Sequence, residues 1–194
     1  MSRAWSVDRL DPDAPLAVNA RRILAVRIAE FYSWDSVVDD HEHIELLHEL
    51  RISAKRLRYT LELFRSTFGE AGERNLVRLR LIQDLLGRLH DHDVRIALIE
   101  DELRTVVVEQ SEALSAALAS AEPKSLPAIT AAAFRPPPDD PRRGLIHLLS
   151  RQHAGRIAIH REFGDLWRTL REEGMRLDLV QLSSIPISAT PETS

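Results

Sequence analysis

A run of basic residues in the first third of the chain has the types and spacing to bind an anion. Four of them recur three or four positions apart: His48, Arg51, Lys55 and Arg58. At about 100° per residue, this spacing places them along one side of a helix. Guanidinium and ammonium groups form charge-assisted hydrogen bonds with phosphate or carboxylate oxygens. The pattern indicates a basic row that needs an anion, supplied either by acids of other helices or by an external polyanion.

The basic row runs beside an apolar seam on the same expected helix. The seam consists of apolar residues at helical spacing: Leu47, Leu50, Ala54, Leu57, Leu61 and Phe64. It predicts the face that packs against neighbouring helices, and the row lies next to it rather than opposite. Like charges three or four positions apart repel one another on a helix. We therefore expect the row at the rim of the packing face, with anions beside it.

Acidic residues farther along the chain offer internal partners for this charge. Asp84 and Asp91 lie on the next expected helix, and either carboxylate could reach Arg56 or Arg58. Gly87 lies between them and costs about 1 kcal/mol in a helix interior relative to alanine. Such a glycine would let another helix approach closely. Two interpretations of the row stay open at this point: internal ion pairs, or a site for an external polyanion.

The elements that must position these residues are helices, because strand signals are almost absent from the sequence. Amphipathic helices are expected at roughly residues 16–33, 39–68, 73–121 and 142–175. They would form a helical domain over residues 15–177, with a proline-rich linker at 122–141. The flanking segments are expected to be an N-terminal extension, residues 1–14, and a flexible C-terminal tail, residues 178–194. This organisation predicts an all-α fold, an antiparallel four-helix bundle.

The third expected helix is long for a small bundle. Unbroken, it would extend about 70 Å. A bend near Gly87 or between His90 and Asp93, or a partner subunit that covers the helix, is therefore expected.

Two motifs in this region resemble those of the CHAD family, the conserved histidine α-helical domains. They are His48-x-x-Arg51-x-x-x-Lys55-Arg56-Leu57-Arg58-Tyr59 and Gln83-Asp84-x-Leu86-Gly87-x-Leu89-x-Asp91. The resemblance implies an all-α fold that binds inorganic polyphosphate in a basic, helix-lined groove. It implies that the four residues of the basic row line that groove. Arg56 matches the motif and is a further candidate for the polyphosphate site, although it points away from the row, as a residue in a structural ion pair would.

The resemblance also implies two four-helix repeats, whereas this chain shows one clear repeat. A weaker echo of the first motif places His153, Arg156 and His160 at the spacing of the first three residues of the row. These three residues are candidates for the same polyphosphate site. A homodimer would restore a two-repeat arrangement, and two-fold pairing is the commonest form of oligomer.

No catalytic residues or cofactor are expected. The sequence contains no GxxxxGK[ST] phosphate loop. CHAD domains often accompany a triphosphatase barrel marked by Glu-x-Glu-x-Lys on a strand. The nearest counterpart, Glu100-Asp-Glu102-Leu-Arg104, lies in an expected helix, where the carboxylates do not converge. The predicted function is non-catalytic polyphosphate binding, and the alternative is a helical scaffold or protein-interaction module.

Histidines beside acidic residues invite a metal interpretation at two places. His90-Asp-His-Asp93 lies within an expected helix, and His41 and His43 lie near a helix start. Successive residues of a helix point in different directions, so at most two side chains of the first group share a face. No metal site is therefore expected.

Composition and charge narrow the classes of partner and compartment. The chain has 194 residues, a net charge of −4 and no cysteine, which excludes disulfides and thiolate metal sites. The acidic stretch 96–122 and the lack of an exposed aromatic series disfavour nucleic acid. No apolar run approaches the ~20 residues that span a bilayer, and the first residues lack the apolar core of a signal peptide. A cytoplasmic protein without membrane attachment is expected.

Overall fold

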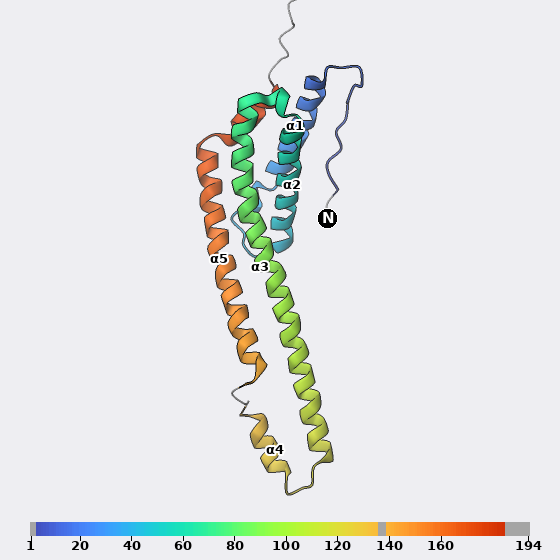
Figure 1. The fold of residues 1–194 in the computed structure, drawn as a ribbon, viewed down its shortest axis with the longest axis vertical. Helices are drawn as coiled ribbons and strands as arrows, with labels where there is room; N and C mark the ends of the chain where they lie inside the picture. Colours follow the sequence, from blue (N-terminus) through green and yellow to red (C-terminus); the bar gives the residue numbers. More distant parts are fainter. Residues whose placement is uncertain (1–2, 136–138, 185–194) are drawn as a thin grey trace, which may run out of the picture. The chain divides into compact units, whose positions relative to one another are not determined.

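The computed structural model describes residues 3–135 and 139–184, and all regular elements in these ranges are helical. The elements follow one another as α1 (Leu16–Tyr32), the short 3₁₀ helix η1 (Asp35–Val37), α2 (Ile44–Leu63), α3 (Arg65–Ser120), α4 (Leu126–Ala133), α5 (Pro141–Glu172) and α6 (Met175–Ser184), as labelled in part in Figure 1. The prediction of an all-α chain is confirmed. No described helix combines the length and the apolar character needed to cross a membrane.

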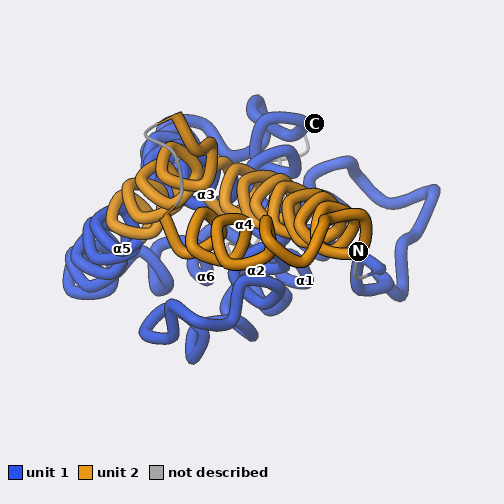
Figure 2. Tube along the Cα trace, turned by 90° about the horizontal axis from the view of Figure 1, so that it is seen from below, with its two compact units in different colours: residues 1–90, 157–194 blue, residues 91–156 orange. Residues whose placement is uncertain are grey.

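The chain divides into two compact units (Figure 2). Unit 1 comprises residues 1–90 and 157–194, and unit 2 comprises residues 91–156. One hydrophobic core in unit 1 collects side chains from α1, α2, α6, the first part of α3 and the last part of α5. Each of these segments contributes a fully buried residue: Leu24, Leu50, Leu79, Phe163 and Leu179. Five helical segments thus contribute to a core for which the sequence predicted four.

Unit 2 has little core of its own. Among its described residues, only Ile96, Asp140 and Arg156 are buried. Asp140 accepts hydrogen bonds from Arg142, at 2.5 Å from Nη2, and the guanidinium holds the pKa of the carboxyl well below its usual range. Leu98, Ile146 and other large apolar residues of this unit stay exposed.

The second helix begins later than expected, at Ile44 rather than near residue 39. The Asp40 carboxylate accepts a hydrogen bond from the backbone N–H of Glu42 at 3.0 Å and pairs with the His43 ring at 2.5 Å. An aspartate that bonds its own backbone two residues on makes a turn that competes with helix. The backbone hydrogen bond lowers the pKa of the Asp40 carboxyl, and His43 lowers it further.

The second helix also ends earlier than the expected residue 68: α2 stops at Leu63, and residues 65–68 begin α3, which breaks at Gly69. Gly69 has φ of 52°, a left-handed value that a glycine adopts without steric cost, and it interrupts α3 shortly after its start. The bend expected near Gly87 or between His90 and Asp93 does not occur. Gly69 is the one residue with non-helical torsions inside α3, which continues to Ser120.

Two segments expected to be irregular contain helices. Residues 126–133 of the linker form α4, with a proline in the first turn, where its missing N–H is not needed. Residues 178–184, assigned to the tail, belong to α6, because Leu179 and Leu182 bury their side chains in the core of unit 1. Gly174, with φ of 76°, makes the turn between α5 and α6. Residues 185–194 of the expected tail and 136–138 of the linker lie outside the described residues.

Candidate anion-binding site

The basic row lies along α2 at the edge of the core of unit 1. His48, Arg51, Lys55 and Arg58 are all half-buried. The seam beside them is buried, and Leu50, Ala54, Leu57 and Leu61 have no exposed surface. The row therefore occupies the rim of the packing face, where the helical spacing placed it.

Contacts from the first part of α3 define what lies across from the row. The rings of His48 and His90 lie 5.1 Å apart between centroids. Near the other end of α2, Glu62 Oε1 lies 3.4 Å from Arg80 Nη2. These two contacts make α2 and α3 antiparallel neighbours, so residues 51–55 lie across from the stretch of α3 between Arg80 and His90.

Positive charge exceeds negative charge along this edge. Arg58 Nη1 lies 2.7 Å from Glu62 Oε1, and its guanidinium lies over the Tyr59 ring at 4.5 Å from the centroid. Glu62 thus pairs with two guanidiniums, those of Arg58 and Arg80. Arg51 and Lys55 form no hydrogen bond or ion pair with any described residue. Half-buried cations without anions carry a desolvation cost that an external anion would remove.

Two buried hydrogen-bond donors near the row also lack acceptors. The amide nitrogen Nε2 of Gln83 and the Nε of Arg58 are buried and have no partner among the described residues. Nearly all buried donors in folded proteins are paired, and one left unpaired costs about 1–3 kcal/mol. The α2–α3 edge therefore presents both positive charge and unused donors. The sequence placed Gln83 in the second motif without a role and did not single out Arg80, since the spacing along α2 carries no signal for residues on a second helix.

Gly87 lies on α3 between the two contacts with α2 and stands in open space. A Cβ atom added there would meet no atom within 4 Å. The expectation that Gly87 lets another helix approach closely is therefore wrong. The space stands open, although a glycine in a helix interior costs about 1 kcal/mol relative to alanine.

Arg56 has a different environment from the row. Its Nη1 lies 2.6 Å from Oε1 of Glu30 on α1, a carboxylate with 2% of its surface exposed. Arg27 also donates a hydrogen bond to Glu30. Arg56 therefore takes part in an internal ion pair. Its partner is not Asp84 or Asp91, which the sequence offered.

The residues of the echo motif differ in their surroundings within each unit. His153 is exposed in unit 2, whereas Arg156 of the same unit is buried and donates a hydrogen bond to Asp93. His160 belongs to unit 1, and its ring lies 5.8 Å from that of His41. The guanidinium of Arg156 is thus engaged within unit 2.

The acidic and histidine residues do not gather into a metal site. Among residues 3–135 and 139–184, no group of three or more such side chains could hold a metal ion. The His90-Asp-His-Asp93 segment disperses its side chains: His90 contacts His48, His92 Nδ1 lies 2.8 Å from Gln152 Oε1, and Asp93 pairs with Arg156.

Comparison with known families gives a decisive match. The family model of the CHAD domain matches residues 3–100, about half of the chain. The chain belongs to the CHAD family. The matched range contains the whole basic row on α2 and the residues of α3 that face it. No curated protein and no solved structure matches this CHAD chain.

Proposed function

We propose that this CHAD chain binds inorganic polyphosphate, without catalysis, along the edge between α2 and α3. His48, Arg51, Lys55 and Arg58 contact the anion, and Gln83 donates a hydrogen bond to it. Arg56, although part of the same motif, stabilises the fold through Glu30. We further propose that α1, α2 and the parts of α3 and α5 in unit 1 are the four helices of the family repeat, to which α6 is added.

The observation that supports this proposal best is the pair of half-buried cations without anions. Arg51 and Lys55 lie one helical turn apart, and neither contacts a carboxylate among the described residues. Glu62, farther along α2, is already shared between two arginines. An anion that reached Arg51 and Lys55 would neutralise both cations.

A linear polyanion fits this edge better than a single phosphate. The row extends over about 15 Å from His48 to Arg58, so one chain could contact all four side chains. Once one part of the polyanion is bound, each further contact is intramolecular and raises the affinity of the whole polyanion for the protein. The open space beside Gly87 would let such a chain approach the α3 backbone.

The proposal is tested by titrating the full chain with long-chain polyphosphate, orthophosphate and single-stranded DNA at several salt concentrations. We expect tight, salt-sensitive binding of polyphosphate, weak binding of orthophosphate, and weaker binding of DNA than of polyphosphate at each salt concentration. Equal affinity for orthophosphate and polyphosphate would contradict the proposal. Tighter binding of DNA would identify the row as a nucleic-acid site instead.

We also propose that a second copy of the chain covers unit 2. The α3 part of this unit is acidic: residues 91–120 contain seven acids and two arginines. The α5 part, residues 141–156, contains four arginines, two histidines and no acid. Under two-fold symmetry, the acidic helix of one copy can lie against the basic helix of the other. Exposed apolar residues, among them Leu98 and Ile146, would be covered in the same contact.

A further inference from the structure

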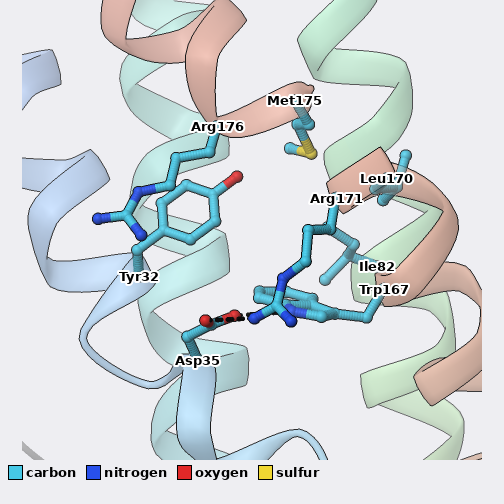
Figure 3. Close-up of a pocket in the computed structure, with 8 residues that line it drawn as sticks. All are labelled: Tyr32, Asp35, Ile82, Trp167, Leu170, Arg171, Met175 and Arg176. Carbon is cyan, nitrogen blue, oxygen red and sulfur yellow. Dashed lines mark hydrogen bonds and ion pairs between the residues drawn. The ribbon is translucent and has the colours of Figure 1, made fainter. Parts of the chain in front are cut away.

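A second site lies in unit 1 away from the basic row, in a pocket where η1, α3, α5 and α6 meet the end of α1 (Figure 3). It encloses about 200 Å³. Its floor is apolar and buried, formed by Ile82, Trp167, Leu170 and Met175. An apolar cavity of about 150 Å³ is large enough for benzene. The pocket can therefore hold one aromatic ring with a short substituent.

The rim of this pocket is polar and carries a surplus of positive charge. Asp35 is fully engaged: its Oδ1 accepts a hydrogen bond from Trp167 Nε1 at 2.9 Å, and its Oδ2 lies 2.6 Å from Arg171 Nη2. The charge of Arg171 is thereby balanced. Arg176 lies over the Tyr32 ring, with 5.0 Å between its guanidinium carbon and the ring centroid, and pairs with no described carboxylate.

The Tyr32 hydroxyl supplies a hydrogen-bond donor at the same rim. It forms no hydrogen bond with a described residue, and in Figure 3 it points away from Asp35 toward the α6 side. Burial raises the pKa of this hydroxyl above its ordinary value, so it keeps its proton at neutral pH. A protonated phenol that points into the pocket suits an anionic oxygen, and in Figure 3 the Arg176 guanidinium lies beside the other end of the Tyr32 ring.

We infer that this pocket binds a small aromatic carboxylate, with its ring on the apolar floor and its carboxylate at the Tyr32 hydroxyl, attracted by the positive charge of Arg176. The indole of Trp167 is fixed by Asp35 and forms one wall against the ring of the ligand. Pockets of this kind use an apolar body contact for affinity and a few convergent polar groups for orientation. The site is independent of the proposed polyphosphate row, since it shares no residue with it.

The test is a titration of the full chain with benzoate, followed by the chemical shift of the Trp167 indole N–H. Two control ligands are titrated in parallel. Benzyl alcohol has the aromatic ring without the charge, and orthophosphate has the charge without the ring. We expect saturable binding of benzoate that shifts the Trp167 signal. Benzyl alcohol should bind roughly tenfold more weakly, because a hydrogen bond to a charged group contributes about 1.5–3 kcal/mol.

Two substitutions locate the carboxylate. Tyr32→Phe removes the hydrogen bond to the carboxylate and should weaken benzoate binding by roughly tenfold, and Arg176→Gln removes a more distant charge and should weaken it by a smaller factor. Arg161→Gln is the matched control, because Arg161 is exposed on α5 and does not line the pocket. The inference is overturned if benzoate fails to shift the Trp167 signal at millimolar concentration. Equal benzoate affinity in Arg176→Gln and Arg161→Gln, or preference for orthophosphate, would overturn it as well.

Discussion

Neighbouring arginines on α2 have opposite roles that depend on which face of the helix each occupies. Arg56 points toward α1 and pairs with the buried Glu30, whereas Arg58 lies in the basic row and shares Glu62 with Arg80. Helical spacing was sufficient to assign the two arginines to different faces of the helix. It could not name Glu30 as the partner, because that contact depends on how α1 packs against α2. It also could not find Gln83, whose unused donor is visible only once α3 is placed.

The Arg56–Glu30 pair predicts a loss of stability on substitution. Arg56→Gln removes one of the two guanidiniums at a buried carboxylate, and breaking a buried ion pair costs about 3–5 kcal/mol. Since Arg27 remains, we expect a loss of about 2–3 kcal/mol in the free energy of unfolding in urea. Arg51→Gln is the control and should change stability by less than about 0.5 kcal/mol. If the two variants have equal stability, the internal role of Arg56 is wrong.

The buried Tyr32 predicts a loss of stability at alkaline pH. Burial raises the pKa of its hydroxyl in the folded chain above the value of about 10 in the unfolded chain. The stabilising contribution is complete below about pH 10 and is lost as pH rises toward the folded-state pKa, because only the unfolded chain ionises there. Urea midpoints at about pH 9 and pH 11 should fall less in Tyr32→Phe than in the wild-type chain. Tyr59→Phe, at a half-exposed position, should behave like wild type.

At the scale of elements, the sequence predicted helix type well and helix ends poorly. The apolar seam of α2 and the interruption at Gly69 were both predicted from local patterns. The late start of α2 depends on the Asp40 turn, and α6 depends on Leu179 and Leu182 reaching the core of unit 1. Such terminal segments are decided by tertiary burial rather than by local composition, which is why residues 178–184 were assigned to a tail.

The open space at Gly87 predicts opposite effects on stability and on binding. In Gly87→Ala the added Cβ meets no protein atom, so α3 should gain up to about 1 kcal/mol. If polyphosphate approaches the helix backbone there, its affinity should fall by roughly tenfold in the same variant. Urea unfolding and polyphosphate titration measure the two effects separately. A stabilised variant with unchanged affinity would place the polyphosphate chain away from Gly87.

At the scale of the whole molecule, charge segregation in unit 2 predicts self-association. Light scattering at micromolar concentration should give a mass of about 44 kDa, twice the 22.0 kDa of one chain. Arg143→Glu with Arg151→Glu reverses the exposed charge of the basic helix and should give a monomer, because the two helices would then repel. Arg74→Glu with Arg161→Glu makes the same change of charge in unit 1 and should remain dimeric. A wild-type mass near 22 kDa would refute the dimer.

The most direct test of the account is the polyphosphate affinity of the double variant Arg51→Glu with Lys55→Glu. The two unpaired cations of the row become anions, so we expect a loss of at least roughly a hundredfold with the helical circular dichroism unchanged. The variant Arg74→Glu with Arg161→Glu carries the same net charge and should bind within about threefold of wild type. If the Arg51→Glu, Lys55→Glu variant fails to fold, the variant Arg51→Gln with Lys55→Gln is compared with the control instead. Equal affinity of the row variant and its charge-matched control would contradict a polyphosphate site on α2.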